Sequence, residues 1–106
     1  MKKEKILALR VALLKAFANA ENVKDTKDGG TCNFDTPGLI LKGWKKTEVI
    51  EAFLLTGLRP YFGKDNVVEI FDGCAGQGFR RTAMAEAMRD SLKADGYTAF
   101  VDYRMD

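Results

Sequence analysis

A glycine-rich segment followed by two arginines is the part of the sequence best suited to hold an anion. It reads Gly73-Cys-Ala-Gly-Gln-Gly-Phe-Arg-Arg-Thr82 and precedes a predicted helix. Glycine lets a backbone approach a ligand closely, and the first turn of a helix offers unpaired N–H groups with a partial positive charge. Arginines in such a turn are disfavoured by the helix dipole unless an anion lies between them and the helix end. We therefore predict a phosphate site here, with a plain turn bearing surface arginines as the alternative. The residues assigned to the site are Gly76, Gln77, Gly78, Phe79, Arg80, Arg81 and Thr82.

A second polar segment reads Asp28-Gly-Gly-Thr-Cys-Asn-Phe-Asp-Thr36. Its alternation predicts a short strand with Thr31, Asn33 and Asp35 on one side. Asn and Asp carry donors and acceptors that match a base edge or a ribose hydroxyl, so we expect this strand to recognise that part of a nucleotide. The alternative is that these residues cap turns and satisfy nearby backbone groups.

Two further residues are candidates for ligand contacts. Trp44 lies between Lys42 and Lys45-Lys46, a pattern that suits stacking on a base with cations beside it. A single tryptophan in a small domain also suits the core, and that alternative stays open. Arg104, close to the end of the sequence, is a candidate partner for phosphate.

The residue types that are absent limit the chemistry. The sequence has no histidine, which removes the commonest general base and metal ligand. Cys32 and Cys74 are expected to be free thiols, and Cys74 lies near a predicted helix N-terminus, where the pKa of a thiol can be lowered. Two cysteines alone make a poor zinc site, and no Walker A lysine follows the glycines. We expect a binding protein rather than an enzyme, with no cofactor and no metal ion.

Hydrophobic periodicity predicts one α+β domain over residues 1–106, with the element order α-β-α-β-β-α-β. We expect the helices to pack on one face of a mixed or antiparallel sheet. The predicted elements are a helix over 3–21, a strand over 31–35 that Pro37-Gly38 breaks before an extended segment at 39–41, a helix capped by Thr47 and ended by Gly57, strands over 60–62 and 67–71, a helix over 79–93 capped by Gly96, and a strand over 97–103.

Composition and the amino-terminal stretch restrict partners and location. The net charge of +2 is too balanced for a nucleic-acid coat protein or a polybasic membrane anchor. Charged residues interrupt the apolar stretch near the start, which argues against a signal peptide, and no apolar run is long enough to span a membrane. We therefore expect a cytoplasmic protein. The amphipathic helix within residues 1–21 has an unusually wide apolar face, which suits an oligomer interface as well as the core.

The second half of the sequence is similar to the first β-α-β unit of an S-adenosylmethionine-dependent methyltransferase. Val67-Val-Glu-Ile-Phe-Asp-Gly-Cys-Ala-Gly-Gln-Gly78 is followed by a predicted helix and then by 97–102. In that reading Asp102 lies where a ribose-binding acid follows the glycine loop. This similarity implies binding of S-adenosylmethionine, and it covers only about the last 40 residues of the chain.

The two polar segments together, with Ala85-Glu86 and Gly96-Tyr97 beyond them, resemble a group of small bacteriophage proteins over residues 25–106. Compact phage proteins of this size include anti-defence sponges, such as the inhibitors of Thoeris and CBASS. The resemblance implies a homodimer or higher homo-oligomer that sequesters a phosphorylated nucleotide signal, cyclic or linear, without cleaving it, in the cytoplasm of an infected host. The alternative function is a nucleic-acid-binding or protein-interaction module.

Overall fold

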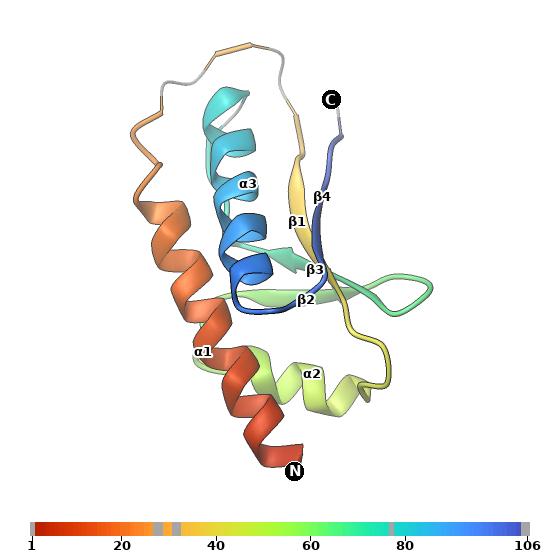
Figure 1. The fold of residues 1–106 in the computed structure, drawn as a ribbon. Helices are drawn as coiled ribbons and strands as arrows, with labels where there is room; N and C mark the ends of the chain where they lie inside the picture. The colour runs from red at the N-terminus through yellow and green to blue at the C-terminus, as the bar shows by residue number, and fades with distance from the viewer. Residues whose placement is uncertain (1, 27–28, 31–32, 77, 105–106) are drawn as a thin grey trace.

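The structure is a computed structural model in which residues 2–26, 29–30, 33–76 and 78–104 are described. Along these residues the helices and strands follow one another in the predicted order, which confirms the α+β fold class (Figure 1). The helices are α1 (Lys2–Glu21), α2 (Lys46–Phe53) and α3 (Phe79–Ala94), and the strands are β1 (Thr36–Ile40), β2 (Arg59–Phe62), β3 (Val67–Phe71) and β4 (Ala99–Asp102).

The strands form one antiparallel sheet in the order β2-β3-β1-β4. Glu69 of β3 pairs with Tyr61 of β2 on one side and with Gly38 of β1 on the other, and Gly38 pairs in turn with Phe100 of β4. From β1 to β4 the elements have the β-α-β-β-α-β order of ferredoxin-like domains, with α1 added in front. Because β1 lies between β3 and β4, these two strands do not form the adjacent parallel pair that a methyltransferase-like unit requires.

The strand β1 differs from the prediction. Residues 33–35 precede the strand instead of forming it, and Thr31 and Cys32 lie outside the described residues. β1 also runs through Pro37 and Gly38, which were predicted to break it. Gly38 has a steric reason to be there: a Cβ at this position would lie 2.5 Å from Cζ of Phe100, so glycine makes room for the ring.

Pro37 fits within β1 because its nitrogen points to where the sheet splits. The N–H of Leu41 donates to Asn66 O, on the β3 side, at 2.9 Å. Donors alternate along a strand, so the nitrogen of Pro37 also faces β3. Pairing of β1 with β3 ends at Gly38 and Glu69, one residue before Pro37 is reached. The absence of an N–H at Pro37 therefore costs no hydrogen bond between the strands, and the two strands separate beyond this point.

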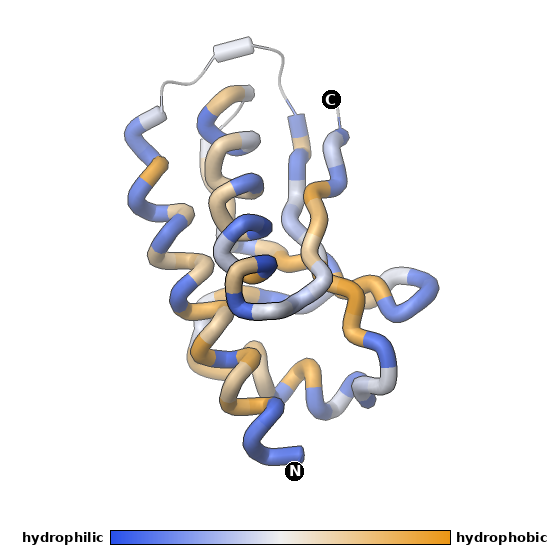
Figure 2. Tube along the Cα trace, in the orientation of Figure 1, coloured by the Kyte–Doolittle hydropathy of each residue, from blue (hydrophilic) through white to orange (hydrophobic). Residues whose placement is uncertain are grey.

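α1 carries apolar residues on two opposite sides. One side is buried against α2 and α3, whereas Leu7, Val11 and Leu14 on the other side are exposed. The core that α1 closes is apolar and continuous: Ile6, Leu9, Leu13, Leu39, Val68, Ile70, Met84, Met88 and Leu92. Figure 2 shows these apolar positions recurring along α1, α3 and the central strands. No helix of the described ranges, the 20-residue α1 included, is long and apolar enough to cross a membrane.

α2 begins and ends earlier than predicted. Its N-cap is Lys45 rather than Thr47, and the carboxylate of Glu48 accepts a hydrogen bond from the Lys45 N–H at 2.8 Å. This contact satisfies the N–H of the N-cap residue itself, whereas the threonine that the sequence favoured as N-cap would accept from an N–H of the first turn. The helix ends at Phe53, before Gly57 is reached.

The turn after α2 contains a leucine in an unfavourable backbone conformation. Leu55 has φ 67° and its surface is 88% exposed. A side chain in left-handed backbone costs roughly 1 kcal/mol relative to glycine, and an exposed leucine regains nothing from packing. We expect Leu55→Gly to raise the free energy of unfolding by about 0.5–1 kcal/mol in urea denaturation. Leu54→Gly is the control and should lower it, because Leu54 has φ −58°. A lower free energy of unfolding for Leu55→Gly than for the wild type would contradict this prediction.

Candidate functional site

The two polar segments predicted to bind a ligand lie against each other within one chain. Gly29 and Gly78 form a parallel bridge, and the N–H of Phe79 donates to Gly29 O at 3.0 Å. Gly78 has φ 56° and ψ −126°, and a Cβ on it would lie 1.5 Å from Gly29 O. The ring of Phe79 covers Gly30, where a Cβ would lie 3.0 Å from ring atoms. The glycines are thus needed for the close approach of one segment to the other.

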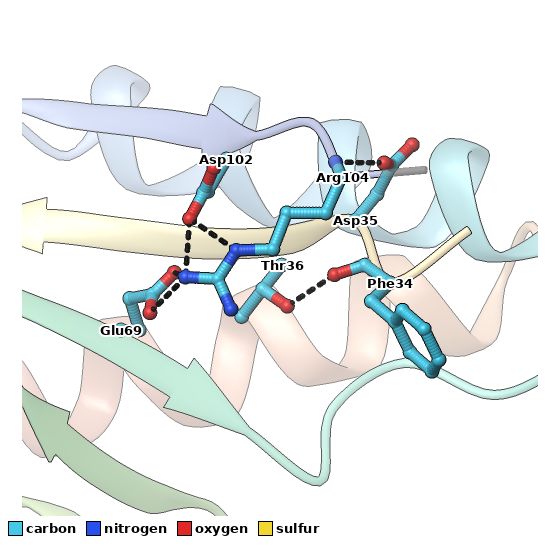
Figure 3. A network of polar contacts seen from close by, with 6 residues as sticks. All are labelled: Phe34, Asp35, Thr36, Glu69, Asp102 and Arg104. Atoms are coloured by element: carbon cyan, nitrogen blue, oxygen red, sulfur yellow. Dashed lines mark hydrogen bonds and ion pairs between the residues drawn. The ribbon is translucent and has the colours of Figure 1, made fainter. Parts of the chain in front are cut away.

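A hydrogen-bond network fastens residues 33–35 to the first turn of α3. Asn33 Nδ2 donates to Gly78 O at 3.0 Å and to Thr82 Oγ1 at 3.2 Å. The Thr82 hydroxyl donates to Asp35 Oδ2 at 2.6 Å. The backbone N–H of Arg104 donates to Asp35 Oδ1 at 2.9 Å (Figure 3). Asp35 is buried with both carboxylate oxygens occupied, so it acts as an internal fastening; recognition of a base by Asn33 and Asp35 stays a prediction.

The two arginines at the start of α3 anchor different loops. Arg80 Nε donates to Thr26 O at 3.0 Å, and Arg81 Nε donates to Asp35 O at 2.9 Å. The Nε bond of Arg81 fixes its guanidinium beside the backbone of residue 35. In the part of the chain that the structure describes, Arg81 forms no ion pair and its two Nη groups have no partner. Arg81 therefore presents a positive charge that no carboxylate of that part neutralises.

Arg104 is held between two carboxylates on the sheet face opposite the core (Figure 3). Its Nη2 donates to Glu69 Oε1 at 2.9 Å, and its Nε donates to Asp102 Oδ2 at 2.7 Å. Burial raises the pKa of Glu69, whereas the Arg104 guanidinium lowers the pKa of Asp102. The positive charge of Arg104, which was predicted to bind phosphate, is thus already compensated by these two carboxylates. Glu69 was not predicted; its signal in the sequence is a single carboxylate within an apolar strand.

A cavity of about 330 Å³ opens where β1 and β3 separate. Phe34 and Phe71 supply aromatic surface, Arg81 and Arg104 supply guanidinium groups, and Cys74 supplies a thiol. The cavity lies beyond Gly38 and Glu69, where the pairing of the two central strands ends. It therefore combines a cation and two aromatic rings at a break in the sheet.

A second and more open hollow, of about 550 Å³, shares Arg104 with this cavity. Six of the twelve predicted ligand-binding residues line it: Asn33, Asp35, Gly78, Phe79, Thr82 and Arg104. The surface of Phe79 is 63% exposed there, but the polar groups of Asn33, Asp35 and Thr82 are bonded to one another. The hollow offers an aromatic ring and few free donors.

Four other predicted site residues lie apart from this region or outside the described residues. Trp44 packs against the core, lines a separate cavity of about 180 Å³, and has Lys5 Nζ 4.4 Å from its ring centroid. Gly76 lies in the loop before α3 at φ 78°. Thr31 and Gln77 fall outside the residues that the structure describes. The structure therefore brings the two polar segments into contact, whereas Trp44 lies away from them.

Cys74 is a poor nucleophile in its present surroundings. Burial raises the pKa of its thiol to about 11, and the nearby Arg81 opposes this only in part. The proximity of a helix N-terminus suggested a lowered pKa, but removal of the thiolate from water has the larger effect. That prediction was wrong.

Grouped metal ligands are not found among residues 2–26, 29–30, 33–76 and 78–104: no three Cys, Asp or Glu side chains there could hold a metal ion together. Comparison with protein-family models, with curated proteins and with solved structures gives no match for this chain.

Proposed function

We propose that the chain binds a small phosphorylated ligand, a nucleotide, in the cavity between β1 and β3. The observation that carries this proposal is the Arg81 guanidinium, which borders the cavity and, among the described residues, is fixed through Nε alone. The Nη groups of arginine match the geometry of two phosphate oxygens, and such charge-assisted bonds are among the strongest that proteins form. Arg81 is therefore the residue expected to hold the phosphate.

The balance of charge around the cavity supports Arg81 in this role. Arg104 faces Glu69 and Asp102, and the carboxylate of Asp72 is paired with Arg59. Each of these charges has an opposite charge beside it. Within the described residues Arg81 has none, so a bound phosphate would complete the pairing of the site.

The aromatic walls suit a base. Phe34 has 53% of its surface exposed, and Phe71 stacks on Tyr61 with ring centroids 5.2 Å apart. Stacking of a base on an aromatic side chain contributes about 1–3 kcal/mol and tolerates different bases. The volume of about 330 Å³ is at the lower end of ligand cavities, which favours one nucleotide unit over a larger dinucleotide.

The proposal extends to binding without turnover, as in a sponge that withholds a nucleotide signal from its receptor. The thiol at the cavity supports this, because a pKa of about 11 leaves it protonated near neutral pH. A ligand recovered intact after prolonged incubation would fit a sponge, and a cleaved one would require an enzyme.

The test is a thermal-shift panel of mono-, di- and cyclic nucleotides, inorganic phosphate and S-adenosylmethionine at two salt concentrations. A ligand present at about 100 times its Kd should stabilise the fold by about 2.7 kcal/mol, which is several degrees in Tm. If no nucleotide shifts the melting temperature at either salt concentration, the proposal is wrong.

Arg81→Gln should weaken binding of the ligand found in that panel ten-fold or more, because it removes a charge-assisted contact to phosphate of about 1.5–3 kcal/mol. Calorimetric titration measures the Kd. The matched control is Arg89→Gln on the same helix, where Arg89 already pairs with Asp90 at 2.9 Å. An equal loss in both variants would contradict a specific role for Arg81.

A nucleic-acid-binding module is the second candidate, and the sheet face opposite the core favours it. Tyr61, 55% exposed, stacks there on Phe71, with Arg59 6.0 Å from the Phe71 ring centroid. Single-stranded nucleic acid stacks on such rings. On the same face two carboxylates, Glu69 and Asp102, share the single guanidinium of Arg104, and this excess of acid disfavours phosphates, which is why we place this function second. Binding of oligonucleotides with a steep salt dependence would favour it over the nucleotide cavity.

A further inference from the structure

Two carboxyl groups share one guanidinium on the sheet face opposite the core (Figure 3). Arg104 Nη2 donates to Glu69 Oε1 at 2.9 Å, and the same nitrogen forms an ion pair with Asp102 Oδ2. Because both oxygens contact one nitrogen, the two carboxyl groups lie close to each other. When both are ionised, these three side chains carry one negative charge in excess.

The surroundings of Glu69 do little to offset this excess. Its side chain is only 6% exposed, so water solvates the carboxylate poorly. The residues paired with it bring no cation, since they are Gly38 of β1 and Tyr61 of β2, whose phenol is uncharged. The other residues of β3 are apolar. On β2 and just after β3, Arg59 and Asp72 form an ion pair that is balanced within itself.

Of the two carboxyl groups, Glu69 is the one suited to hold a proton. Burial first, and then the contact with Asp102, raise the pKa of Glu69, and Arg104 opposes them only in part. The Arg104 guanidinium lowers the pKa of Asp102. A carboxylic acid at position 69 can donate to Asp102 while its other oxygen accepts from Arg104. The three side chains then carry no net charge.

Arg104 connects these side chains to the cavity between β1 and β3. Its guanidinium lines the cavity, and so does that of Arg81. When Glu69 is ionised, the excess negative charge beside Arg104 opposes the positive charge that Arg81 presents to an anion. When Glu69 is protonated, this opposition ends and the charge of Arg81 acts alone.

We propose that Glu69 holds a proton that it loses as the pH rises, and that this proton strengthens the binding of anions in the cavity. The first half concerns the protein by itself, whereas the second half rests on the proposed function of the cavity. The coupling is reciprocal, because an anion bound in the cavity also makes the ionisation of Glu69 less favourable. Separate measurements test the two halves.

Carbon-13 NMR of the Glu69 carboxyl group in the wild-type protein tests the first half directly. A glutamate in water has a pKa of about 4.3, and we expect Glu69 to titrate at a higher pH. Asp102→Asn should move this titration to lower pH, because it removes the second carboxylate while Arg104 stays in place. A wild-type midpoint at or below the ordinary value for glutamate would overturn the proposal.

The stability of Glu69→Gln gives a second measurement, because the amide resembles the protonated acid and cannot ionise. A raised pKa means that the proton on Glu69 stabilises the fold fully below about pH 4.3, and that this contribution is lost as the pH rises through the pKa of the folded protein. The free energy of unfolding of the wild type should therefore fall relative to that of Glu69→Gln between about pH 4 and 8. Glu51→Gln, at an exposed position of α2, corrects for the loss of one acidic group. A constant difference between the wild type and Glu69→Gln would contradict the first half.

Sulfate is the probe for the second half, because its own charge is constant over this pH range. Calorimetric titration of the wild type should give a Kd roughly three-fold or more lower at about pH 5 than at about pH 8. Glu69→Gln should bind sulfate equally well at both pH values, and Arg81→Gln should bind it weakly at both. Wild-type binding that does not change with pH would overturn the coupling. Absence of sulfate binding at either pH, with Glu69 titrating as expected, would overturn the second half and the anion site of the proposed function while confirming the first half.

Discussion

Gly78→Ala is expected to lower the free energy of unfolding by about 3 kcal/mol or more and Tm by roughly 10 °C or more. The added Cβ would lie 1.5 Å from Gly29 O, which is a backbone atom and cannot turn aside. The residue must also keep φ 56° and ψ −126°, a conformation almost restricted to glycine. Neither the Gly29 oxygen nor the backbone conformation of residue 78 can change to relieve the clash, so residues 29–30 must detach from the start of α3. Urea and thermal unfolding of the variant measure the loss.

Gly43→Ala is the control that measures the cost of backbone strain without the steric clash of Gly78→Ala. Gly43 has φ 84°, but a Cβ there would meet no atom within 4 Å. Its substitution carries only the cost of left-handed backbone, about 1–2 kcal/mol. The excess loss in Gly78→Ala therefore reports the contact between the two segments. Equal losses in the two variants would show that the segments do not pack as the structure has them.

The fold could be predicted where one local pattern dominates. α1 and α3 have long helical periodicity, and β3 is an uninterrupted β-prone run apart from Glu69, so their positions in the sequence were nearly correct. β1 was misplaced because proline and glycine are read locally as a break. In the sheet, Pro37 needs no donor at the point where β1 leaves β3, and Gly38 admits the ring of Phe100. Both reasons are tertiary, so no local rule reveals them.

The sequence predicted which residues make up the candidate site, but not that they form hydrogen bonds with one another. The two polar segments do meet, yet Asn33, Asp35 and Thr82 satisfy one another, which their residue types alone could not distinguish from ligand binding. Arg104 pairs with Glu69 of β3, which lies 35 residues earlier in the sequence. Periodicity describes neighbours along the chain and carries no information about such pairs.

Asp35→Ala is expected to lower the free energy of unfolding by roughly 2–4 kcal/mol, because it removes the carboxylate to which two donors are bonded in a partly buried place. Those donors are the Thr82 hydroxyl, 2.6 Å from Oδ2, and the Arg104 N–H, 2.9 Å from Oδ1. Urea denaturation measures the change. Thr36→Ala in the neighbouring position removes a single hydroxyl that donates to Phe34 O at 2.7 Å, and it should cost about 1 kcal/mol.

Asp35→Asn distinguishes a fastening from a ligand contact. Its amide oxygen can still accept from the Arg104 N–H, and its NH₂ group can donate to Thr82 Oγ1. The Thr82 hydroxyl then donates to Gly78 O, which lies 3.1 Å away. We therefore expect this variant to lose less than about 1.5 kcal/mol of stability and to keep the wild-type affinity for nucleotide. A ten-fold loss of affinity in a stable Asp35→Asn would instead mean that the carboxylate itself recognises a hydroxyl of the ligand, as the sequence predicts.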